Sequence, residues 1–293
     1  MTIRSPLRAS TRSRAAAYVL FSAAVMLSVS PCAADERRIV ALGGAVTEIL
    51  YALGQQDRIV AVDTTSLYPP EALKTKPNVG YFRALSAEGI LSVQPTLVIA
   101  VDGAGPPAAL ASLEQAHVPV ARTPDTPTPE GVATKIRSVG QAVQAQAQAD
   151  KLADEVERRF GELAEARAKI TKRKRVLFIL SLQNGRATVG GRGTAADAMI
   201  ALAGGENAAA DVQGYKPMTD EALLAAAPDA VVMMDLGPDS KTEDVFARPA
   251  FATSPAARAN ALISMNGLYL LGFGPRAPEA ERDLMAKLYP AQN

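Results

Sequence analysis

The sequence has almost no thiol and almost no imidazole. Its 293 residues include one cysteine, Cys32, and one histidine, His117. A single cysteine cannot form an internal disulfide or a thiolate metal site, so stability has to come from packing. A lone histidine without a partner is weak support for a metal ligand, and we interpret His117 as structural.

The chain also lacks an excess of charge of either sign. It carries 31 basic and 30 acidic residues, for a net charge of +1, which gives no electrostatic reason to expect nucleic acid as a partner. It has no Gly-x-Ser-x-Gly elbow, and no spacing among its carboxylates requires a catalytic pair. We therefore expect a binding protein rather than an enzyme. A secreted enzyme with a carboxylate-based site, drawn from Asp63, Asp102, Asp197 or Asp235, is the alternative from another class.

The N-terminus reads as a targeting segment. Four arginines within the first 14 residues precede an apolar run over residues 15–27, which is too short to span a membrane comfortably. Small residues follow, so residues 1–34 are predicted to be a secretory signal peptide, cleaved near Ala33 or Ala34. Cys32 leaves a lipoprotein open as an alternative, but the proline before it departs from the usual lipoprotein pattern.

The first part of the mature chain alternates strands with helices. Apolar strand patterns cover residues 38–42, 57–62 and 97–101, and helical patterns cover residues 46–53 and 86–93 between them. This order predicts a parallel-type sheet with crossover helices.

Residues 128–172 have a different character. No glycine occurs between Gly140 and Gly161, and Ala, Gln, Glu, Lys and Arg dominate. Apolar residues recur at three- or four-residue spacing, which predicts one long helix with Gly161 as the place where it would break. Such a helix would be a rigid connector between two halves, and a helical hairpin or surface coiled coil is the alternative.

A short pattern occurs once in each half of the chain. A capped helix that starts at Ser86 leads through Pro95 to a strand, and one that starts at Thr219 leads through Pro228 to another. The fold class predicted is α/β, with two α/β lobes joined by the long helix and a ligand cleft between them. The lobes are expected at residues 35–127 and 173–293.

The loop around Tyr81 carries the most specific side chains. Gly80 is a turn residue, and Tyr81 and Arg83 are two apart, so their side chains leave an extended loop on the same side. A neighbouring cation favours the phenolate, which is a hard anionic ligand for ferric iron. The alternative is a buried loop tyrosine whose hydroxyl finds a partner, with Arg83 as a surface charge.

Three segments carry a resemblance to a known family. They are residues 80–89 (GYFRALSAEG), 191–199 (GRGTAADAM) and 271–276 (LGFGPR). Over residues 38–289 the chain resembles haem-binding periplasmic substrate-binding proteins of bacterial ABC importers, in the superfamily that also carries ferric siderophores and cobalamin. The resemblance implies two α/β lobes with little hinge motion, a periplasmic location, and an inner-membrane permease with its ATPase as partner. We expect the protein to act as a monomer.

The resemblance also implies roles for individual residues. Tyr81 matches the tyrosine that ligates haem iron, and Arg83 matches its hydrogen-bonding partner. Some relatives add a histidine from the second lobe, whereas His117 belongs to the first, so five-coordinate iron is expected. Glu88 and Glu221 match a pair of acids, one per lobe, that docks onto permease arginines. They could equally be first-turn acids that favour the helix dipole.

The rest of the haem would need donors and apolar cover. Arg192, Lys216 and Arg276 lie on loops of the second lobe and could bind the propionates, or could be solvated charges. Cover for the porphyrin faces is expected from four apolar side chains, any of which could instead be core: Phe82, Tyr215, Met218 and Phe273.

Two other functions fit the same fold. A cobalamin carrier or a ferric-siderophore carrier is the first alternative, but cobalamin brings its own lower ligand and a siderophore already saturates its iron. Either ligand would leave Tyr81 and Arg83 without a purpose. A haem store or scavenger without an importer is the second.

Overall fold

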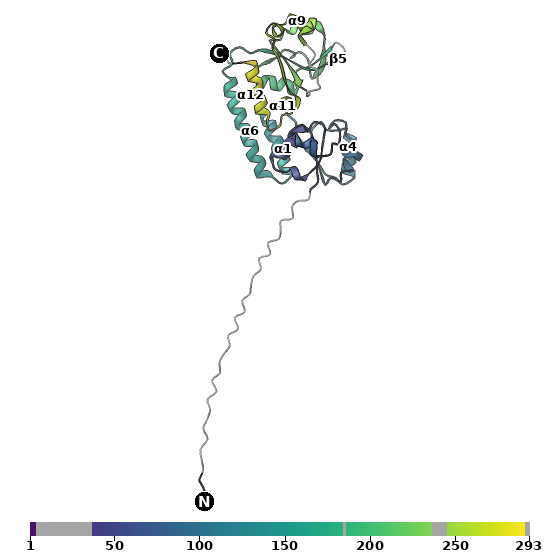
Figure 1. Cartoon of the computed structure of the whole chain (residues 1–293), viewed down its shortest axis with the longest axis vertical. Helices are drawn as coiled ribbons and strands as arrows, with labels where there is room; N and C mark the ends of the chain where they lie inside the picture. Colours follow the sequence, from purple (N-terminus) through teal and green to yellow (C-terminus); the bar gives the residue numbers. More distant parts are fainter. Residues whose placement is uncertain (4–36, 184–185, 236–244, 291–293) are drawn as a thin grey trace. The chain divides into compact units, whose positions relative to one another are not determined.

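The computed structural model describes residues 1–3, 37–183, 186–235 and 245–290. The predicted signal peptide, including Cys32, falls on residues that lie almost entirely outside these ranges. The chain divides into two units, Met1–Glu36 and Arg37–Asn293, and the fold belongs to the second (Figure 1). Within the described residues, no helix is both long and apolar enough to cross a membrane.

The first half of this unit contains a four-stranded parallel sheet. The strand order is β2-β1-β3-β4, so the carboxyl ends of all four strands share one edge. Fully buried apolar runs in β1 and β3 suit strands that are covered on both faces. The parallel sheet predicted from the alternation is confirmed. Its strands are β1 (Ile39–Leu42), β2 (Ile59–Val62), β3 (Leu97–Val101) and β4 (Val120–Thr123).

Short helices connect these strands. The longer two of them, α1 and α4, carry buried apolar residues that pack on the sheet. In chain order the connections contain α1 (Gly44–Ala52), the 3-10 turn η1 (Gln56–Arg58), α2 (Glu71–Thr75), α3 (Ala87–Leu91) and α4 (Pro107–Gln115).

Two helices, rather than one, occupy the predicted connector. They are α5 (Pro129–Ala142) and α6 (Gln146–Arg167), and the break falls at Val143–Ala145, where Gln144 has a φ of 59°. The small residues Gly140 and Ala149 allow the helices to meet, since a Cβ on Gly140 would lie 2.2 Å from that of Ala149. The single-helix prediction is therefore wrong, and the hairpin alternative is correct. Gly161, the predicted break, lies inside α6.

The second half contains a six-stranded sheet of mixed direction. The strand order is β10-β9-β5-β6-β8, with β7 on β5. The parallel-type prediction is correct for the pairs that link β10, β9, β5 and β7, but β6 runs antiparallel to both of its neighbours, β5 and β8. Only residues 184–185 separate β5 from β6, and so short a connection can join antiparallel strands only. The strands are β5 (Arg175–Gln183), β6 (Arg186–Gly190), β7 (Glu206–Asn207), β8 (Tyr215–Met218), β9 (Ala230–Asp235) and β10 (Leu262–Asn266).

The helices of this half include the final helix of the protein. α12 packs along α6, and Figure 1 shows the two side by side. The helical elements are α7 (Ala195–Leu202), α8 (Asp220–Ala226), η2 (Val245–Ala247), α9 (Pro249–Ala252), α10 (Pro255–Arg258), α11 (Gly267–Leu271) and α12 (Ala277–Leu288).

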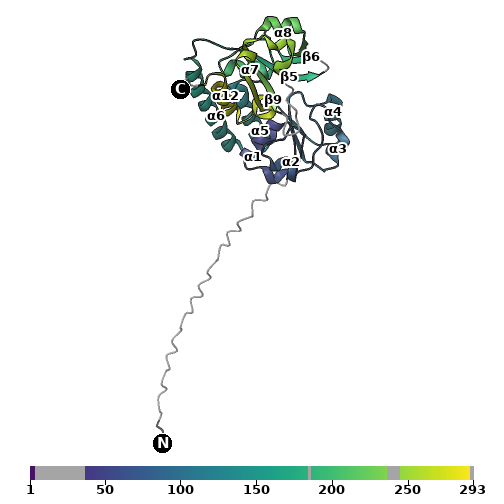
Figure 2. The same cartoon turned by 45° about the horizontal axis from the view of Figure 1, so that its top comes forward.

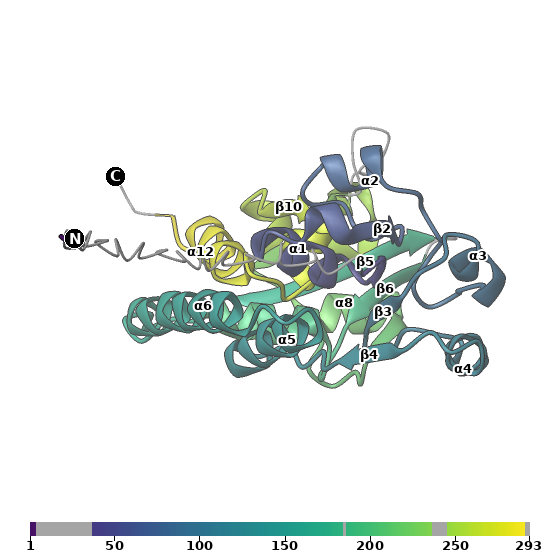
Figure 3. The ribbon, with the colours of Figure 1, turned by 90° about the horizontal axis from the view of Figure 1, so that it is seen from below.

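One hydrophobic core runs through both halves. It contains strand residues of both sheets together with the inner faces of α5, α6 and α12. Figure 2 shows α6 beside α12 at one side of the fold, and Figure 3 shows α5 lying against α6. A second, smaller cluster fills the space between β5, β9 and α9. The halves are thus joined by packing rather than by a linker, and the lobe boundaries predicted from the sequence stay predictions.

Candidate functional site

The Tyr81 loop is held at the carboxyl edge of the first sheet. Val79 donates a backbone hydrogen bond to the carbonyl of Val62 at the end of β2 (2.9 Å), and Gly105, after β3, donates to that of Phe82 (2.8 Å). Gly80 has a φ of 95° and open space where a Cβ would stand, so glycine is required there by the backbone rather than by packing. The backbone is therefore fixed by hydrogen bonds both before and after Tyr81.

Tyr81 and Arg83 meet on this loop. The guanidinium Nη1 of Arg83 donates to the Tyr81 hydroxyl at 3.3 Å, and its Cζ lies 4.7 Å from the centre of the Phe82 ring. Tyr81 keeps 41% of its surface exposed. The buried-tyrosine alternative is therefore wrong, and an exposed phenol oxygen stands beside a cation.

Tyr215 approaches this pair from the second half. Partial burial raises the pKa of the Tyr215 phenol, and hydrogen bonding to Ala196 and Thr194 and the positive charge of Arg83 act against that rise. The ring packs edge-on to Phe178, with ring centres 6.4 Å apart. Arg83 thus has a tyrosine from its own loop on one side and a tyrosine from the other half within electrostatic range.

The remaining candidates on β8 do not join Tyr215. Successive side chains of a strand leave opposite faces of its sheet, so Lys216 and Met218 point away from the face that Tyr215 shares with Phe178. Met218 accordingly packs against the second core cluster, and Lys216 is exposed. Lys216 was predicted as a propionate donor and Met218 as apolar cover at the same site as Tyr215. The alternation of side chains along β8 places both on the opposite face of the sheet from Tyr215.

Of the two arginine candidates for propionates, only Arg192 stays exposed. Its Nε and Nη2 donate to the Ala210 carbonyl at 3.0 and 2.7 Å, which leaves Nη1 for another acceptor. Arg276 instead forms three hydrogen bonds of 2.9–3.1 Å with Glu48, whose side chain is only 6% exposed. Arg276 is therefore engaged in a contact between the halves, and its assignment to propionates stays a prediction.

Two predicted apolar contacts belong to the core. Phe273 is 1% exposed and Phe82 is 9% exposed, so neither offers a ring face to a ligand in this structure. The Phe273 carbonyl accepts a hydrogen bond from the ammonium of Lys135 at 3.1 Å, and Lys135 is itself fully buried. Residues 272–276 are thus bound to α1 through Glu48 and to α5 through Lys135, and we call this segment the joint between the halves. The sequence pattern had indicated neither Glu48 nor Lys135.

The two docking candidates lie at equivalent helix starts. Glu88 and Glu221 are both exposed in the first turns of α3 and α8. Ser86 caps α3 and Thr219 caps α8, each by accepting a backbone hydrogen bond at 3.3 Å. Hydrogen bonding from its own backbone N–H and from Thr219 lowers the pKa of Glu221. The geometry fits acids that favour the helix dipole and leaves both carboxylates accessible.

Residues with metal-binding or catalytic side chains do not cluster. Among the described residues, no group of three or more His, Cys, Asp or Glu side chains could hold a metal ion. His117 is exposed just before β4, at the edge opposite to Tyr81. Asp63 is fully buried and accepts from the Gly43 backbone and the Thr65 hydroxyl, which makes it structural.

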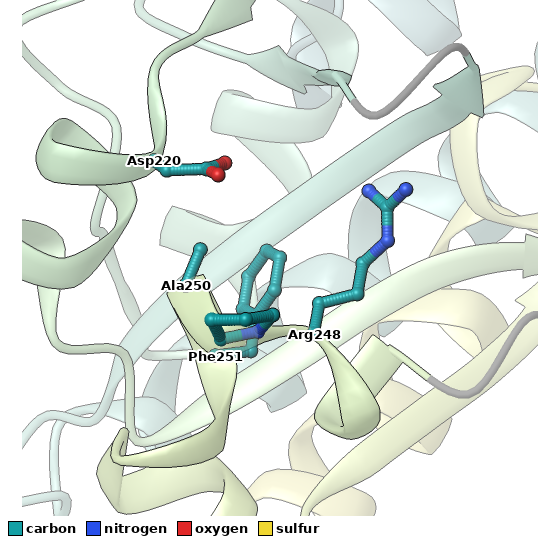
Figure 4. Close-up of a pocket in the computed structure, with 5 residues that line it drawn as sticks. Asp220, Arg248, Ala250 and Phe251 are labelled. Atoms are coloured by element: carbon teal, nitrogen blue, oxygen red, sulfur yellow. The ribbon is translucent and has the colours of Figure 1, made fainter.

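A small pocket of the second half lies apart from the predicted site. It is lined by residues at the start of α8 and around α9, and it includes none of the predicted ligand contacts: Asp220, Arg248, Pro249, Ala250 and Phe251 (Figure 4). Figure 4 shows the carboxylate of Asp220 and the guanidinium of Arg248 projecting from different elements.

The sequence reasoning missed two exposed apolar residues after β2. Leu67 is 49% exposed and Tyr68 is 40% exposed, and the guanidinium of Arg276 stacks 3.4 Å from the centre of the Tyr68 ring. The Tyr68-Pro69-Pro70 stretch predicted only a loop leading to Tyr81. Nothing in its sequence predicted that Arg276, more than 200 residues later, would contact Tyr68.

Comparison with known proteins places the chain in a family. The profile of the periplasmic binding protein family matches residues 39–267. The chain is similar to the solved periplasmic haem-binding protein RhuT from Roseiflexus sp. RS-1, with 42% identity, a TM-score of 0.82, and coverage of 86% of this chain and 98% of that one. It is also similar to the periplasmic vitamin B12 binding protein BtuF of Vibrio cholerae, with 26% identity, a TM-score of 0.74, and coverage of 86% and 96%.

A third similarity concerns transport. The chain is 29% identical over 259 residues to an uncharacterised ABC transporter substrate-binding lipoprotein, YvrC, from Bacillus subtilis (strain 168). The match covers 87% of this chain and 81% of the relative.

Proposed function

This chain belongs to the periplasmic binding protein family, and from that premise we propose that it captures ferric haem in the periplasm for delivery to an ABC importer. The observation that carries the proposal is the exposed Tyr81 hydroxyl with the Arg83 guanidinium hydrogen-bonded to it. A phenolate oxygen bound to ferric iron carries negative charge, and Arg83 is placed to balance that charge. The 42% identity to a haem-binding protein over nearly the whole mature chain supports the same ligand.

Within this proposal the residues have unequal roles. Tyr81 would ligate the iron, Arg83 would stabilise the ligating oxygen, and Tyr215 would face them from the second half. Arg192 is the remaining arginine of the predicted set that could bind a propionate, since Arg276 is held by Glu48. The haem itself supplies the redox-active metal as transported cargo, and the chain's own side chains bind and orient it.

The proposal is tested by titrating the pure protein with ferric haem. The expected result is a Soret band with the charge-transfer absorption of iron bound to tyrosinate, and Tyr81→Phe should lose that signature and most of the affinity. Tyr51→Phe, in α1 and away from the loop, is the matched control and should behave as the wild type. A Tyr81→Phe spectrum identical to that of the wild type would refute the assignment.

Vitamin B12 is the second candidate ligand, because the chain is similar to a vitamin B12 binding protein over most of its length. Cobalamin brings its own axial ligand and needs neither a phenol nor a guanidinium. Titration with cyanocobalamin in the absence and presence of haem separates the two ligands. Tight cobalamin binding that haem does not displace would favour this second function.

Export and delivery complete the proposal. A cleaved signal over residues 1–34 would bring the protein to the periplasm, and the name of its relative YvrC keeps acylation of Cys32 as the alternative. We propose that Glu88 and Glu221 dock onto basic residues of the permease. Glu88→Ala/Glu221→Ala should lose capture of the reconstituted transporter while still binding haem. Glu71→Ala/Glu162→Ala, at other helical positions, should keep both haem binding and capture of the transporter. Equal capture by both double variants would argue against docking through Glu88 and Glu221.

A further inference from the structure

Four of five large exposed apolar side chains in the described part of the fold lie near the place where the two halves of the protein meet. Among the described residues from 37 onward, the large hydrophobic side chains that stay exposed are Leu67, Tyr68, Tyr81, Tyr215 and Leu224. The first three lie on two neighbouring loops, which are joined by a 2.9 Å hydrogen bond from the backbone of Thr64 to the carbonyl of Gly80. Tyr215 faces Arg83 from the other half. A gathering of this kind marks a binding surface more often than isolated exposed residues do.

The exposed ring of Tyr68 is held in a fixed orientation by a stacked arginine. The Arg276 guanidinium stacks on its ring with 3.4 Å from Cζ to the ring centre, and lies 5.1 Å from the centre of the Tyr269 ring. Arg276 is fixed in turn by its backbone N–H, Nε and Nη2, all of which donate to the Glu48 carboxylate. The contacts run from α1 in one half to the start of α12 in the other, so the ring orientation depends on how the halves are joined.

The stacked ring nevertheless remains accessible. With the guanidinium against the ring, Tyr68 still keeps 40% of its surface exposed, and Leu67 beside it keeps 49%. A rigid aromatic ring with an open surface loses little conformational entropy when a flat ligand packs against it.

We propose that Tyr68, with Leu67, is a second ligand-contacting surface that packs against the porphyrin, and that the Glu48–Arg276 pair positions its ring. This inference rests on the proposed function and adds a contact that is independent of the iron. Arg276 thereby acts as a positioning residue that touches no ligand. Tyr68 contributes dispersion and apolar burial rather than metal coordination.

A porphyrin without metal isolates this contact. Protoporphyrin IX offers the same flat apolar surface and propionates as haem but no iron for Tyr81, so its binding, followed by fluorescence, reports the contacts other than iron ligation. Tyr68→Ala should weaken binding of both protoporphyrin IX and ferric haem by about tenfold, in line with the stacking energy of one aromatic ring. At saturating haem, Tyr68→Ala should keep the tyrosinate absorption, because Tyr81 and Arg83 are untouched.

Three further variants make the test specific. Tyr68→Phe keeps the ring and should bind within about twofold of the wild type. Leu224→Ala removes an equally exposed apolar side chain on α8 and should change neither affinity. Arg276→Lys leaves Tyr68 in the chain but removes the planar stack and the paired hydrogen bonds, and should weaken both porphyrins by several-fold. It also keeps the test decisive if Tyr68→Ala does not fold.

The outcomes distinguish this inference from the proposed function. A wild-type protein that binds neither porphyrin would refute the haem function itself. A wild type that binds both, with affinities that Tyr68→Ala and Arg276→Lys leave unchanged, would refute the Tyr68 contact alone. Equal losses of porphyrin affinity in Leu224→Ala and Tyr68→Ala would also refute the Tyr68 contact, because the effect would then not be specific to the position of Tyr68.

Discussion

Glu281 is a carboxylate that the fold buries between α12 and α6. Its side chain is fully buried, and its Oε1 accepts a 3.0 Å hydrogen bond from Nη1 of Arg167. Its Oε2 is buried with no hydrogen-bond partner among the described residues. Arg167 is shared, since the same Nη1 also donates to the Leu202 carbonyl at 2.9 Å. The carboxylate is therefore only half compensated.

The stability cost of this arrangement follows from the pKa. Burial raises the pKa of Glu281 from 4.5 to about 7, against the opposing effect of Arg167. Each pH unit by which a pKa differs between the folded and unfolded states corresponds to about 1.4 kcal/mol, so ionised Glu281 costs folding at most about 3.5 kcal/mol. A raised pKa means that the cost is absent below pH 4.5, grows as the pH rises toward 7, and is complete above it.

Glu281→Gln replaces the carboxylate by its neutral isostere. Urea unfolding at several pH values should show the variant more stable than the wild type by about 2–3 kcal/mol at pH 8.5, and equal within about 0.5 kcal/mol at pH 4. Glu162→Gln removes an exposed partner of Arg158 and should stay within about 0.5 kcal/mol of the wild type at both pH values. If Glu281→Gln proved less stable than the wild type at pH 8.5, the pair with Arg167 would be net stabilising and the reasoning refuted.

Denaturant unfolding of three further variants tests the contact of Lys135 with residues 272–276, the loop at Gly191 and the cap of α3. Lys135→Met removes a fully buried ammonium that pairs at 2.5 Å with the partly exposed Asp125 and donates to the Phe273 carbonyl, and should cost about 1–3 kcal/mol, whereas a wild-type midpoint would show that the buried ammonium contributes nothing. Gly191→Ala would place a Cβ 2.2 Å from the Val212 carbonyl oxygen and should cost about 1–3 kcal/mol, and full stability would mean that the loop relaxes freely. Ser86→Ala removes the cap of α3 and should cost about 1 kcal/mol, with no loss contradicting the cap assignment.

Local patterns were sufficient for much of the fold. The strand at residues 97–101 and the strand at residues 230–234 were predicted because continuous apolar runs bounded by proline suit buried strands. The break between α5 and α6 was missed because apolar spacing of four continues from Val139 to Val143 across the turn. Periodicity reports which side chains are buried, and it stays unchanged when a helix turns back onto the same core.

The candidate site divides in the same way. The distance of two residues from Tyr81 to Arg83 is short enough for the backbone alone to bring the two side chains to one side, and the 3.3 Å hydrogen bond between them is the outcome. The position of the Lys216 side chain could not be predicted from local spacing, because it depends on which face of β8 packs against Phe178. That choice is made by pairing with β6, and by packing on either side of the sheet.

The sequence by itself determined the alternation of elements, the parallel sheet of the first half and the pairing of neighbouring side chains, since each depends on residues within a few positions of one another. Only the tertiary structure decided that Arg276 binds Glu48, 228 residues away, and stacks on Tyr68. Short-range preferences act through the backbone and leave a pattern in the chain. Contacts between distant residues arise from how the two halves pack, and no spacing in the sequence records them.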